Sequence, residues 1–138
     1  MFGPEEFLLK TVLVIDDEQS FTAILSEILQ EHGYRVLIAS DPMAGLAFAR
    51  SEFPDVILVD LVMPEMTGWQ LLKHLDEDIT TASIPVIVLT AVAGEDEFIR
   101  RALERRSIKY LAKPLKVPDL LESIERMTAA KEKVREGI

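Results

Sequence analysis

The stretch VILVDLVMPEMTG, residues 56–68, joins the most apolar short run of the chain to a carboxylate. Val56 to Val59 are typical of a strand that is covered on both faces, and Asp60 follows directly. A buried charge is costly unless it is paired or bound to a metal ion. The sequence therefore predicts a compensating partner for Asp60, and the other apolar runs indicate where that partner comes from.

Five apolar runs alternate along the chain with longer segments of helical periodicity. The expected strands are residues 11–15, 35–39, 55–59, 85–89 and 108–112. They are rich in Val, Ile and Leu and alternate little, which is typical of parallel strands with helices on both faces. Right-handed crossovers between such strands predict an α/β fold with a doubly wound, five-stranded parallel sheet.

The segments between the strands carry apolar residues at the spacing of one helix face. Gly33 is expected to stop the first helix, and Asp41-Pro42 to cap and open the second. The stripes expected to face inward are Phe21, Ile24, Leu25, Ile28 and Leu29; Leu71, Leu72 and Leu75; Phe98, Ala102 and Leu103; and, after Pro118, Leu120, Leu121, Ile124 and Met127.

Composition narrows the classes of function. The 138 residues are enough for one domain. With 15 Lys and Arg against 24 Asp and Glu, the net charge of −9 disfavours non-specific binding to nucleic acid or to anionic membranes. The lack of cysteine excludes disulfides and thiol catalysis. Neither a secretory leader nor an apolar run of membrane-spanning length is present, so we expect a cytoplasmic protein.

Polar residues follow four of the five expected strands, namely Asp16 and Asp17, Asp60, Thr90 and Lys113. The binding crevice of an open α/β sheet lies beyond the carboxyl ends of its strands, so we expect these side chains to meet there. Carboxylate oxygens without His or Cys favour Mg²⁺, with Mn²⁺ as a substitute, over zinc. A phosphoryl group is suited to a position between that cation, a lysine and a hydroxyl, which makes Asp60 the candidate nucleophile.

Four stretches, taken in order, resemble the response regulator receiver domain of two-component signalling, the CheY-like family. They are VLVIDDE (12–18), DVILVDLVMPEMTGWQLL (55–72), PVIVLTA (85–91) and YLAKPL (110–115). The resemblance implies a flavodoxin-like receiver fold with strand order 2-1-3-4-5. It also implies an N-terminal extension over residues 1–10, a receiver domain over 11–130, and a tail over 131–138 that continues the last helix.

The resemblance also implies a metal site at this edge of the sheet. Asp60 matches the phosphoacceptor of the family. Asp17 matches a direct Mg²⁺ ligand, and Asp16 matches one that acts mainly through water. The backbone carbonyl of Val62 matches the remaining protein ligand.

Three further residues match the family's phosphoryl-binding and switching positions. Thr90 matches the hydroxyl that bonds the phosphoryl group on activation, and Lys113 matches the cation that pairs with it. The Lys113–Pro114 peptide bond is expected to be cis. Tyr110 matches the aromatic switch residue, whose ring turns inward when Thr90 moves toward the phosphate.

The same resemblance implies a signalling switch with autocatalytic phosphoryl transfer and autodephosphorylation rather than an enzyme. Its expected partners are a sensor histidine kinase or a histidine phosphotransfer protein, and an output target or domain. The output surface is expected on the fourth helix, fifth strand and fifth helix, and a phosphorylation-dependent homodimer would use the same surface. No direct binding to nucleic acid or to membrane is expected.

The sequence departs from the family in two places. Ser107-Ile108-Lys109 stands where receivers often have a Gly-Ala pair before the fifth strand. Val62 and Val92 are apolar where some relatives carry polar residues near the attacking water. The second departure predicts a slowly hydrolysing phosphoaspartate.

Three other functions compete with this interpretation. A haloacid-dehalogenase-like phosphatase needs a second Asp two residues after the nucleophile, where this chain has Val62. A flavodoxin-like flavin binder would place its phosphate against Asp16-Asp17-Glu18, which would repel it. A receiver-like adaptor that binds partners without phosphorylation stays open. His32 and His74 are expected at the surface, neither of them as a phosphorelay histidine.

Overall fold

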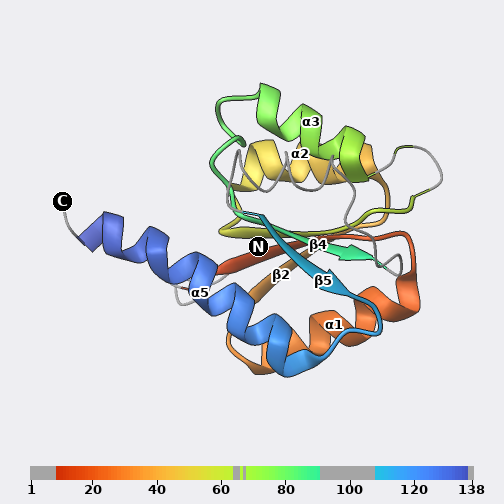
Figure 1. The fold of residues 1–138 in the computed structure, drawn as a ribbon, viewed down its shortest axis with the longest axis horizontal. Coiled ribbons are helices and arrows are strands. Elements are labelled where there is room, and N and C mark those ends of the chain that lie inside the picture. Colours follow the sequence, from red (N-terminus) through yellow and green to blue (C-terminus); the bar gives the residue numbers. More distant parts are fainter. Residues whose placement is uncertain (1–8, 64–65, 67, 91–107, 137–138) are drawn as a thin grey trace.

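Five parallel strands form one sheet in the order β2-β1-β3-β4-β5, which confirms the predicted doubly wound arrangement (Figure 1). The structure is a computed structural model that describes residues 9–63, 66, 68–90 and 108–136, and only the backbone of Thr90 and of residues 130–136. The strands are β1 (Thr11–Ile15), β2 (Arg35–Ala39), β3 (Val56–Asp60), β4 (Val86–Thr90) and β5 (Ile108–Ala112). The helices are α1 (Gln19–Glu31), α2 (Pro42–Glu52), α3 (Gly68–Glu77) and α5 (Val117–Glu136). The expected helix with Phe98, Ala102 and Leu103 lies outside the described residues.

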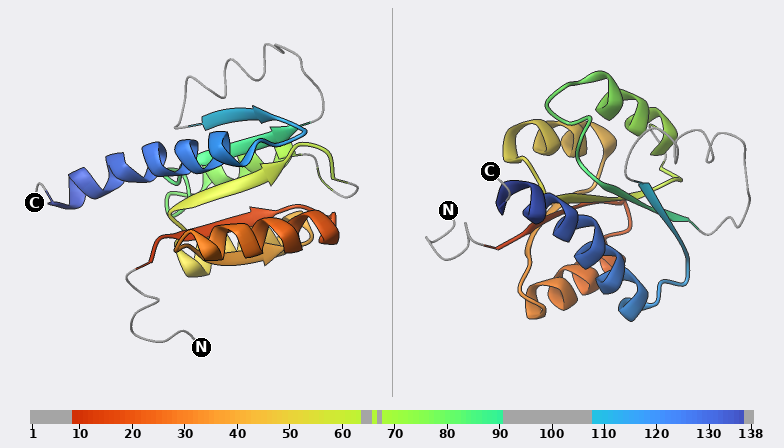
Figure 2. Two further views of the ribbon diagram at one scale, coloured as in Figure 1. Left: turned by 90° about the horizontal axis from the view of Figure 1, so that it is seen from below. Right: turned by 60° about the vertical axis from the view of Figure 1, so that its left-hand side comes forward.

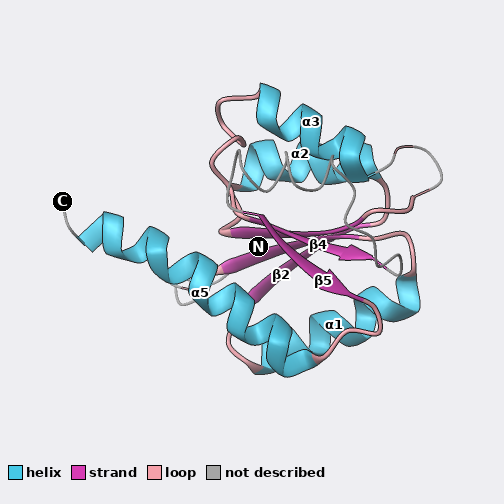
Figure 3. Ribbon diagram, viewed as in Figure 1, coloured by secondary structure: helices cyan, strands magenta, loops and turns pink. Residues whose placement is uncertain are grey.

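Within the described residues, helices cover both faces of the sheet (Figure 3). Helices α2 and α3 lie on one face, and α1 and α5 lie on the other, as Figure 2 shows from two further directions. Within the central strands, alternate residues enter the two cores: Leu13, Ile15, Ile57 and Val59 on the α2–α3 side, and Val12, Val14, Val56 and Leu58 on the α1–α5 side. Because both faces are covered, these strands need apolar residues at every position, which explains their lack of alternation.

Strands β3 and β4 each lie one residue later than the sequence predicted. The side chain of Asp55 accepts a hydrogen bond from the amide of Thr11 at 2.7 Å, so it ties the start of β1 to the loop before β3. At the other end Asp60 still pairs with Leu89 in the β3–β4 ladder. The carboxylate of Asp60 is therefore carried by the last residue of a central strand.

In helix α1, one residue of the predicted inward-facing stripe, Ile24, faces solvent instead. Ile24 is 61% exposed, whereas Thr22, Leu25 and Leu29 are buried. Thr22 can be buried at low cost because its hydroxyl donates to the carbonyl of Gln19 at 3.1 Å. Thr22 is therefore buried together with Leu25 and Leu29, and Ile24 faces solvent.

The other helix features that were predicted within the described residues are confirmed. Gly33 follows α1 with a φ of 87°, a conformation that favours glycine. The side chain of Asp41 accepts a hydrogen bond from the amide of Ala44 and caps α2. The inward stripes of α3 and α5 are Leu71, Leu72 and Leu75, and Leu120 and Ile124 with partly buried Leu121 and Met127. Across the described residues, no helix combines the length and apolar character of a membrane span.

Replacing Gly45 by alanine is expected to destabilise the contact between α2 and β1. A Cβ at this position would lie 2.6 Å from Cδ1 of Ile15, which is fully buried. We expect Gly45→Ala to lower the free energy of unfolding by about 1–3 kcal/mol through overpacking. Ile15→Val removes the nearest methyl group, so the double variant should lose less than the sum of the two single variants in urea unfolding. Strict additivity would contradict this contact.

Candidate functional site

The carboxyl ends of the strands bring the predicted polar residues to one edge of the sheet. All five strands run in the same direction, so their arrowheads lie at one end in Figure 2 (left). Asp16 follows β1, Asp60 ends the neighbouring strand β3, and Lys113 follows β5. In the sheet order, β1 neighbours β3, and β4 lies between β3 and β5. The carboxyl ends of these strands therefore bring together residues that are far apart in the sequence.

Three carboxylates form a cluster at this edge. Asp16, Asp17 and Asp60 each offer one carboxylate oxygen, and these atoms lie within 4.8 Å of one another. Asp16 is only 1% exposed, and the side chain of Asp60 is 13% exposed, whereas Asp17 faces solvent. A compact set of hard oxygen ligands, partly buried and partly open, suits Mg²⁺ with part of its water shell retained.

Lys113 contacts the buried carboxylate of Asp16 and the partly buried carboxylate of Asp60. Its Nζ is 3.3 Å from Oδ2 of Asp16 and 3.4 Å from Oδ2 of Asp60. The other oxygen of each carboxylate accepts a hydrogen bond from a backbone amide. Asp16 accepts from the amide of Glu18, and Asp60 accepts from the amide of Val62. The peptide bond after Lys113 is cis, as expected.

The pKa values of the site reflect burial together with these charges. Burial is the largest influence on Asp16 and raises the pKa of its carboxyl, and the negative charge of Asp60 adds to this. The Glu18 amide and Lys113 act in the opposite direction but do not outweigh burial. For Lys113, burial favours the neutral amine, but the charges of Asp16 and Asp60 outweigh it and raise the pKa of the ammonium. The site therefore holds an excess of negative charge that one lysine does not balance.

Magnesium is expected to stabilise the protein, and Asp16→Asn should remove most of that effect. The raised pKa of Asp16 means that its ionised form destabilises the metal-free fold once the pH exceeds that pKa. Without metal, Asp16→Asn should therefore unfold at a temperature equal to or above that of the wild type. With Mg²⁺ at 100 times its dissociation constant, the wild type should gain about 2.7 kcal/mol.

Scanning calorimetry in Mg²⁺ and in EDTA would measure this difference. Asp76→Asn, on the exposed surface of α3, is the matched control and should gain as much from Mg²⁺ as the wild type. An equal gain in Asp16→Asn would show that the metal binds elsewhere.

Gly68, the first residue of α3, lies against the backbone of Asp60 and Leu61. A Cβ on Gly68 would lie 2.8 Å from the carbonyl oxygen of Asp60 and 2.8 Å from Cα of Leu61. The amide of Gly68 donates to the carbonyl of Leu61 at 2.9 Å. Only a residue without a side chain allows α3 to begin this close to the backbone of Asp60 and Leu61.

The other predicted site residues are placed less completely. Thr90 ends β4 and pairs with Ala112, but its side chain lies outside the described atoms. Tyr110 pairs with Val88 and packs, partly buried, against the α2–α3 core. Val92 and Ser107 lie outside the described residues. The roles of all the predicted site residues stay predictions.

One residue of the site was not recognised as such from the sequence. The ring centroid of Phe21 lies 4.7 Å from Nζ of Lys113, within the range of a cation–π contact. The apolar periodicity places Phe21 on the inner stripe of α1, and no local pattern connects it to a lysine after β5. Both histidines are exposed, as expected.

This chain is similar in sequence and in fold to known proteins. Residues 12–125 match the profile of the family described as the response regulator receiver domain. The chain is 36% identical over 118 residues to Protein PilH of Pseudomonas aeruginosa, which covers 86% of this chain and 97% of PilH.

Two solved structures illustrate the likeness. A CheY-like receiver domain protein from Methanospirillum hungatei superposes with a TM-score of 0.81 at 31% identity, covering 91% of this chain and 98% of that protein. The receiver domain of the sensor histidine kinase PA1611 from Pseudomonas aeruginosa superposes with a TM-score of 0.77 at 25% identity, covering 88% and 98%. The PA1611 structure has a magnesium ion coordinated in its active site cleft. Receiver domains bind Mg²⁺ at an acidic pocket and interact with histidine kinases or phosphotransfer proteins. From its fold, its acidic edge and this match over most of its length, the chain belongs to the response regulator receiver domain family of two-component signalling.

Proposed function

We propose that this chain is a phosphorylation-controlled switch whose phosphoacceptor is Asp60. One observation carries the proposal: the Asp60 carboxylate belongs both to the three-carboxylate cluster and to the ion pair with Lys113. Asp16 shares both of these contacts but follows β1, whereas Asp60 is the last residue of the central strand β3. Such a setting supplies the positive charge that a transferred phosphoryl group requires.

In the proposed reaction, a carboxylate oxygen of Asp60 attacks the phosphorus of a phosphohistidine on a sensor kinase or phosphotransfer protein. The P–N bond breaks, the imidazole leaves with its electron pair and takes a proton from solvent, and an acyl phosphate forms on Asp60. Lys113 moves from the carboxylates to an oxygen of the arriving phosphoryl group, and Thr90 donates a hydroxyl hydrogen bond to it. Water later attacks the phosphorus, the P–O bond to Asp60 breaks, and inorganic phosphate leaves, which restores the free carboxylate.

The metal site of the proposal consists of Asp16, Asp17, Asp60 and the carbonyl of Val62. Mg²⁺, or Mn²⁺ in its place, supplies positive charge that offsets the phosphoryl oxygens. Asp16 is held in place by the amide of Glu18 at 2.9 Å, and Asp60 by the amide of Val62 at 3.1 Å. The carboxylates are thus oriented by the backbone before any cation binds.

Phosphorylation is proposed to shift an existing equilibrium between two conformers. Thr90 and Tyr110 link the state of Asp60 to the surface of β5, α5 and the expected fourth helix, which lies outside the described residues. An output target or a second copy of the chain binds to that surface. The proposed receiver domain spans residues 11–130, with the extension before it and the tail after it. The proposed location is the cytoplasm, where a histidine kinase would supply the phosphoryl group.

The lifetime of the phosphorylated state is proposed to be long. Val62 is 66% exposed beside Asp60 and offers no hydrogen bond from its side chain to orient an attacking water. A phosphate-release assay on Val62→Asn should therefore show faster dephosphorylation than the wild type. An unchanged or slower release would mean that the apolar side chain at position 62 does not limit the rate of hydrolysis.

The test of the proposal is phosphoryl uptake from acetyl phosphate, followed by intact mass. One adduct should appear with Mg²⁺ and not with EDTA, and Trp69, the sole tryptophan, gives a parallel fluorescence signal next to Gly68. Failure of uptake from both acetyl phosphate and a phosphorylated histidine kinase, in a protein that still binds Mg²⁺, would favour the adaptor function instead.

A further inference from the structure

The Phe21–Lys113 contact joins helix α1 to the segment after β5, next to the carboxylates of Asp16 and Asp60. Phe21 lies in the first turns of α1 and packs against the α1–α5 core. Its ring centroid is 4.7 Å from Nζ of Lys113, the same atom that contacts Asp16 and Asp60. The aromatic face and both carboxylates therefore share one ammonium group.

The ion pairs with Asp16 and Asp60 do not by themselves hold the Lys113 ammonium in one position. Their N–O distances of 3.3 and 3.4 Å exceed the roughly 2.7–2.9 Å that charge-assisted hydrogen bonds usually reach. A lysine side chain has four rotatable carbon segments and a point charge, so neither carboxylate determines its position by geometry. The ring is the third contact that restricts where the charge can lie.

The ring differs from the carboxylates in one further respect. A bound cation and an acyl phosphate on Asp60 both change the charge of the carboxylates that hold Lys113. The ring is uncharged, and its helix is anchored in the core by Leu25 and Leu29, which are buried. A change in the charge of the carboxylates therefore leaves the charge of the ring unchanged.

We propose that Phe21 is a positioning residue, which holds the Lys113 ammonium over Asp60 so that it can bind the arriving phosphoryl group. The inference rests on the proposed function and assigns a role to a residue outside the acidic cluster. Phe21 has no hydrogen-bonding group, so it acts on the phosphoryl group only through Lys113.

The contact itself is tested by NMR without any ligand. Lysine side-chain Hε protons near an aromatic face are shifted upfield by its ring current, and Lys113→Arg identifies the resonance. The upfield shift should be present in the wild type and in Phe21→Tyr, and absent in Phe21→Leu, which keeps the apolar packing. An unshifted wild-type resonance, or the same shift in Phe21→Leu, would overturn the proposal.

The role is tested by the affinity for beryllofluoride, a phosphoryl mimic, in the presence of Mg²⁺, read from Trp69 fluorescence. Phe21→Leu should bind it about two- to ten-fold more weakly, and Phe21→Tyr should restore binding, since the strength of a cation–π contact sets this range. The affinity for Mg²⁺ alone should be unchanged in both variants.

A second background separates positioning from packing. In Lys113→Met, which lacks the ammonium, adding Phe21→Leu should cause no further loss of beryllofluoride affinity. An equal loss with and without Lys113 would assign Phe21 a purely structural role and overturn the inference. If the wild type itself fails to respond to beryllofluoride and to acetyl phosphate, the proposed function fails, and the positioning role fails with it.

Discussion

Asp60→Asn is expected to abolish phosphoryl uptake from acetyl phosphate. An amide oxygen is a poor nucleophile and cannot carry the acyl phosphate, so no adduct should appear in the intact mass even with Mg²⁺ present. The replacement has nearly the same shape, and its carbonyl can still accept the Val62 amide, which lies 3.1 Å from Oδ1 of Asp60. The loss should therefore be chemical rather than structural.

Two controls make this result specific. Asp76→Asn removes an exposed carboxylate from α3 and should leave uptake at the wild-type level. Circular dichroism of Asp60→Asn should match that of the wild type, because the buried strand before residue 60 is unchanged. Full uptake in Asp60→Asn would move the phosphoacceptor to another carboxylate and contradict the assignment.

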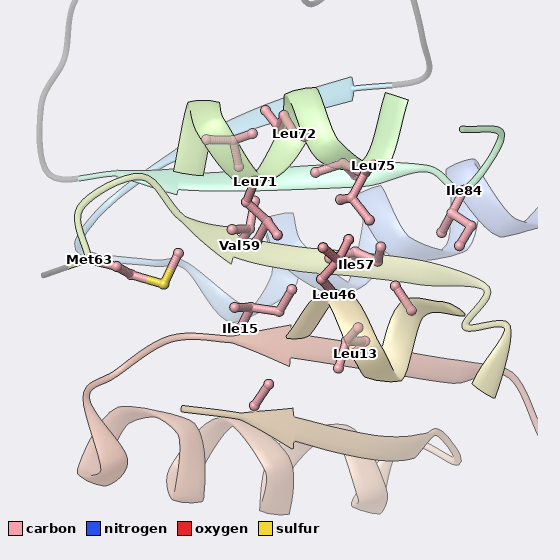
Figure 4. Packing of buried hydrophobic residues seen from close by; sticks show 14 of the residues in the cluster. Leu13, Ile15, Leu46, Ile57, Val59, Met63, Leu71, Leu72, Leu75 and Ile84 are labelled. Atoms are coloured by element: carbon pink, nitrogen blue, oxygen red, sulfur yellow. The ribbon is translucent and has the colours of Figure 1, made fainter. Parts of the chain in front are cut away.

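Ile57→Ala is expected to lower the free energy of unfolding by about 2–5 kcal/mol. Ile57 is fully buried in β3, where it pairs with Leu13 on one side and Val86 on the other. Figure 4 shows its side chain within the α2–α3 core, together with Leu46 and Leu75. Truncation leaves a cavity in the middle of the strand that carries Asp60, and close-packed neighbours fill such cavities only in part.

Urea unfolding measures this loss, and the chain offers a matched control. Ile79 is 92% exposed, so Ile79→Ala should change the free energy of unfolding by less than about 0.5 kcal/mol. Similar losses at both positions would mean that β3 is not the buried centre of the sheet. Where Ile57→Ala remains folded, its Mg²⁺ affinity shows how far the position of Asp60 depends on the packing beneath it.

The sheet could be predicted because the apolar composition of each central strand indicates that both of its faces are buried. Val12 to Ile15 and Val56 to Val59 lack alternation since both faces are covered, and that pattern is local. Parallel order then brings Asp16 and Asp60 to the same edge without any further information. The cluster of carboxylates and the lysine therefore follow from strand ends alone.

Other features depend on tertiary packing and were not predictable in this way. Ile24 has the spacing of a core residue, yet Thr22 takes the buried position because its hydroxyl finds a carbonyl within the helix. Phe21 and Lys113 are far apart in the sequence, so no local pattern predicts their contact. The close approach of Gly68 to the backbone of Asp60 is likewise visible only in three dimensions.

The proposed switch depends on an acyl phosphate at Asp60, which chemical reduction can identify. Borohydride reduces an acyl phosphate to an alcohol and leaves free carboxylates intact, so a phosphorylated aspartate becomes homoserine. After incubation with acetyl phosphate and Mg²⁺, peptide mass mapping should find homoserine at position 60 and at no other aspartate, and in EDTA at none. Homoserine at Asp16 or Asp17, or a phosphoryl group that survives reduction on a hydroxyl side chain, would contradict the assignment of Asp60 as the phosphoacceptor.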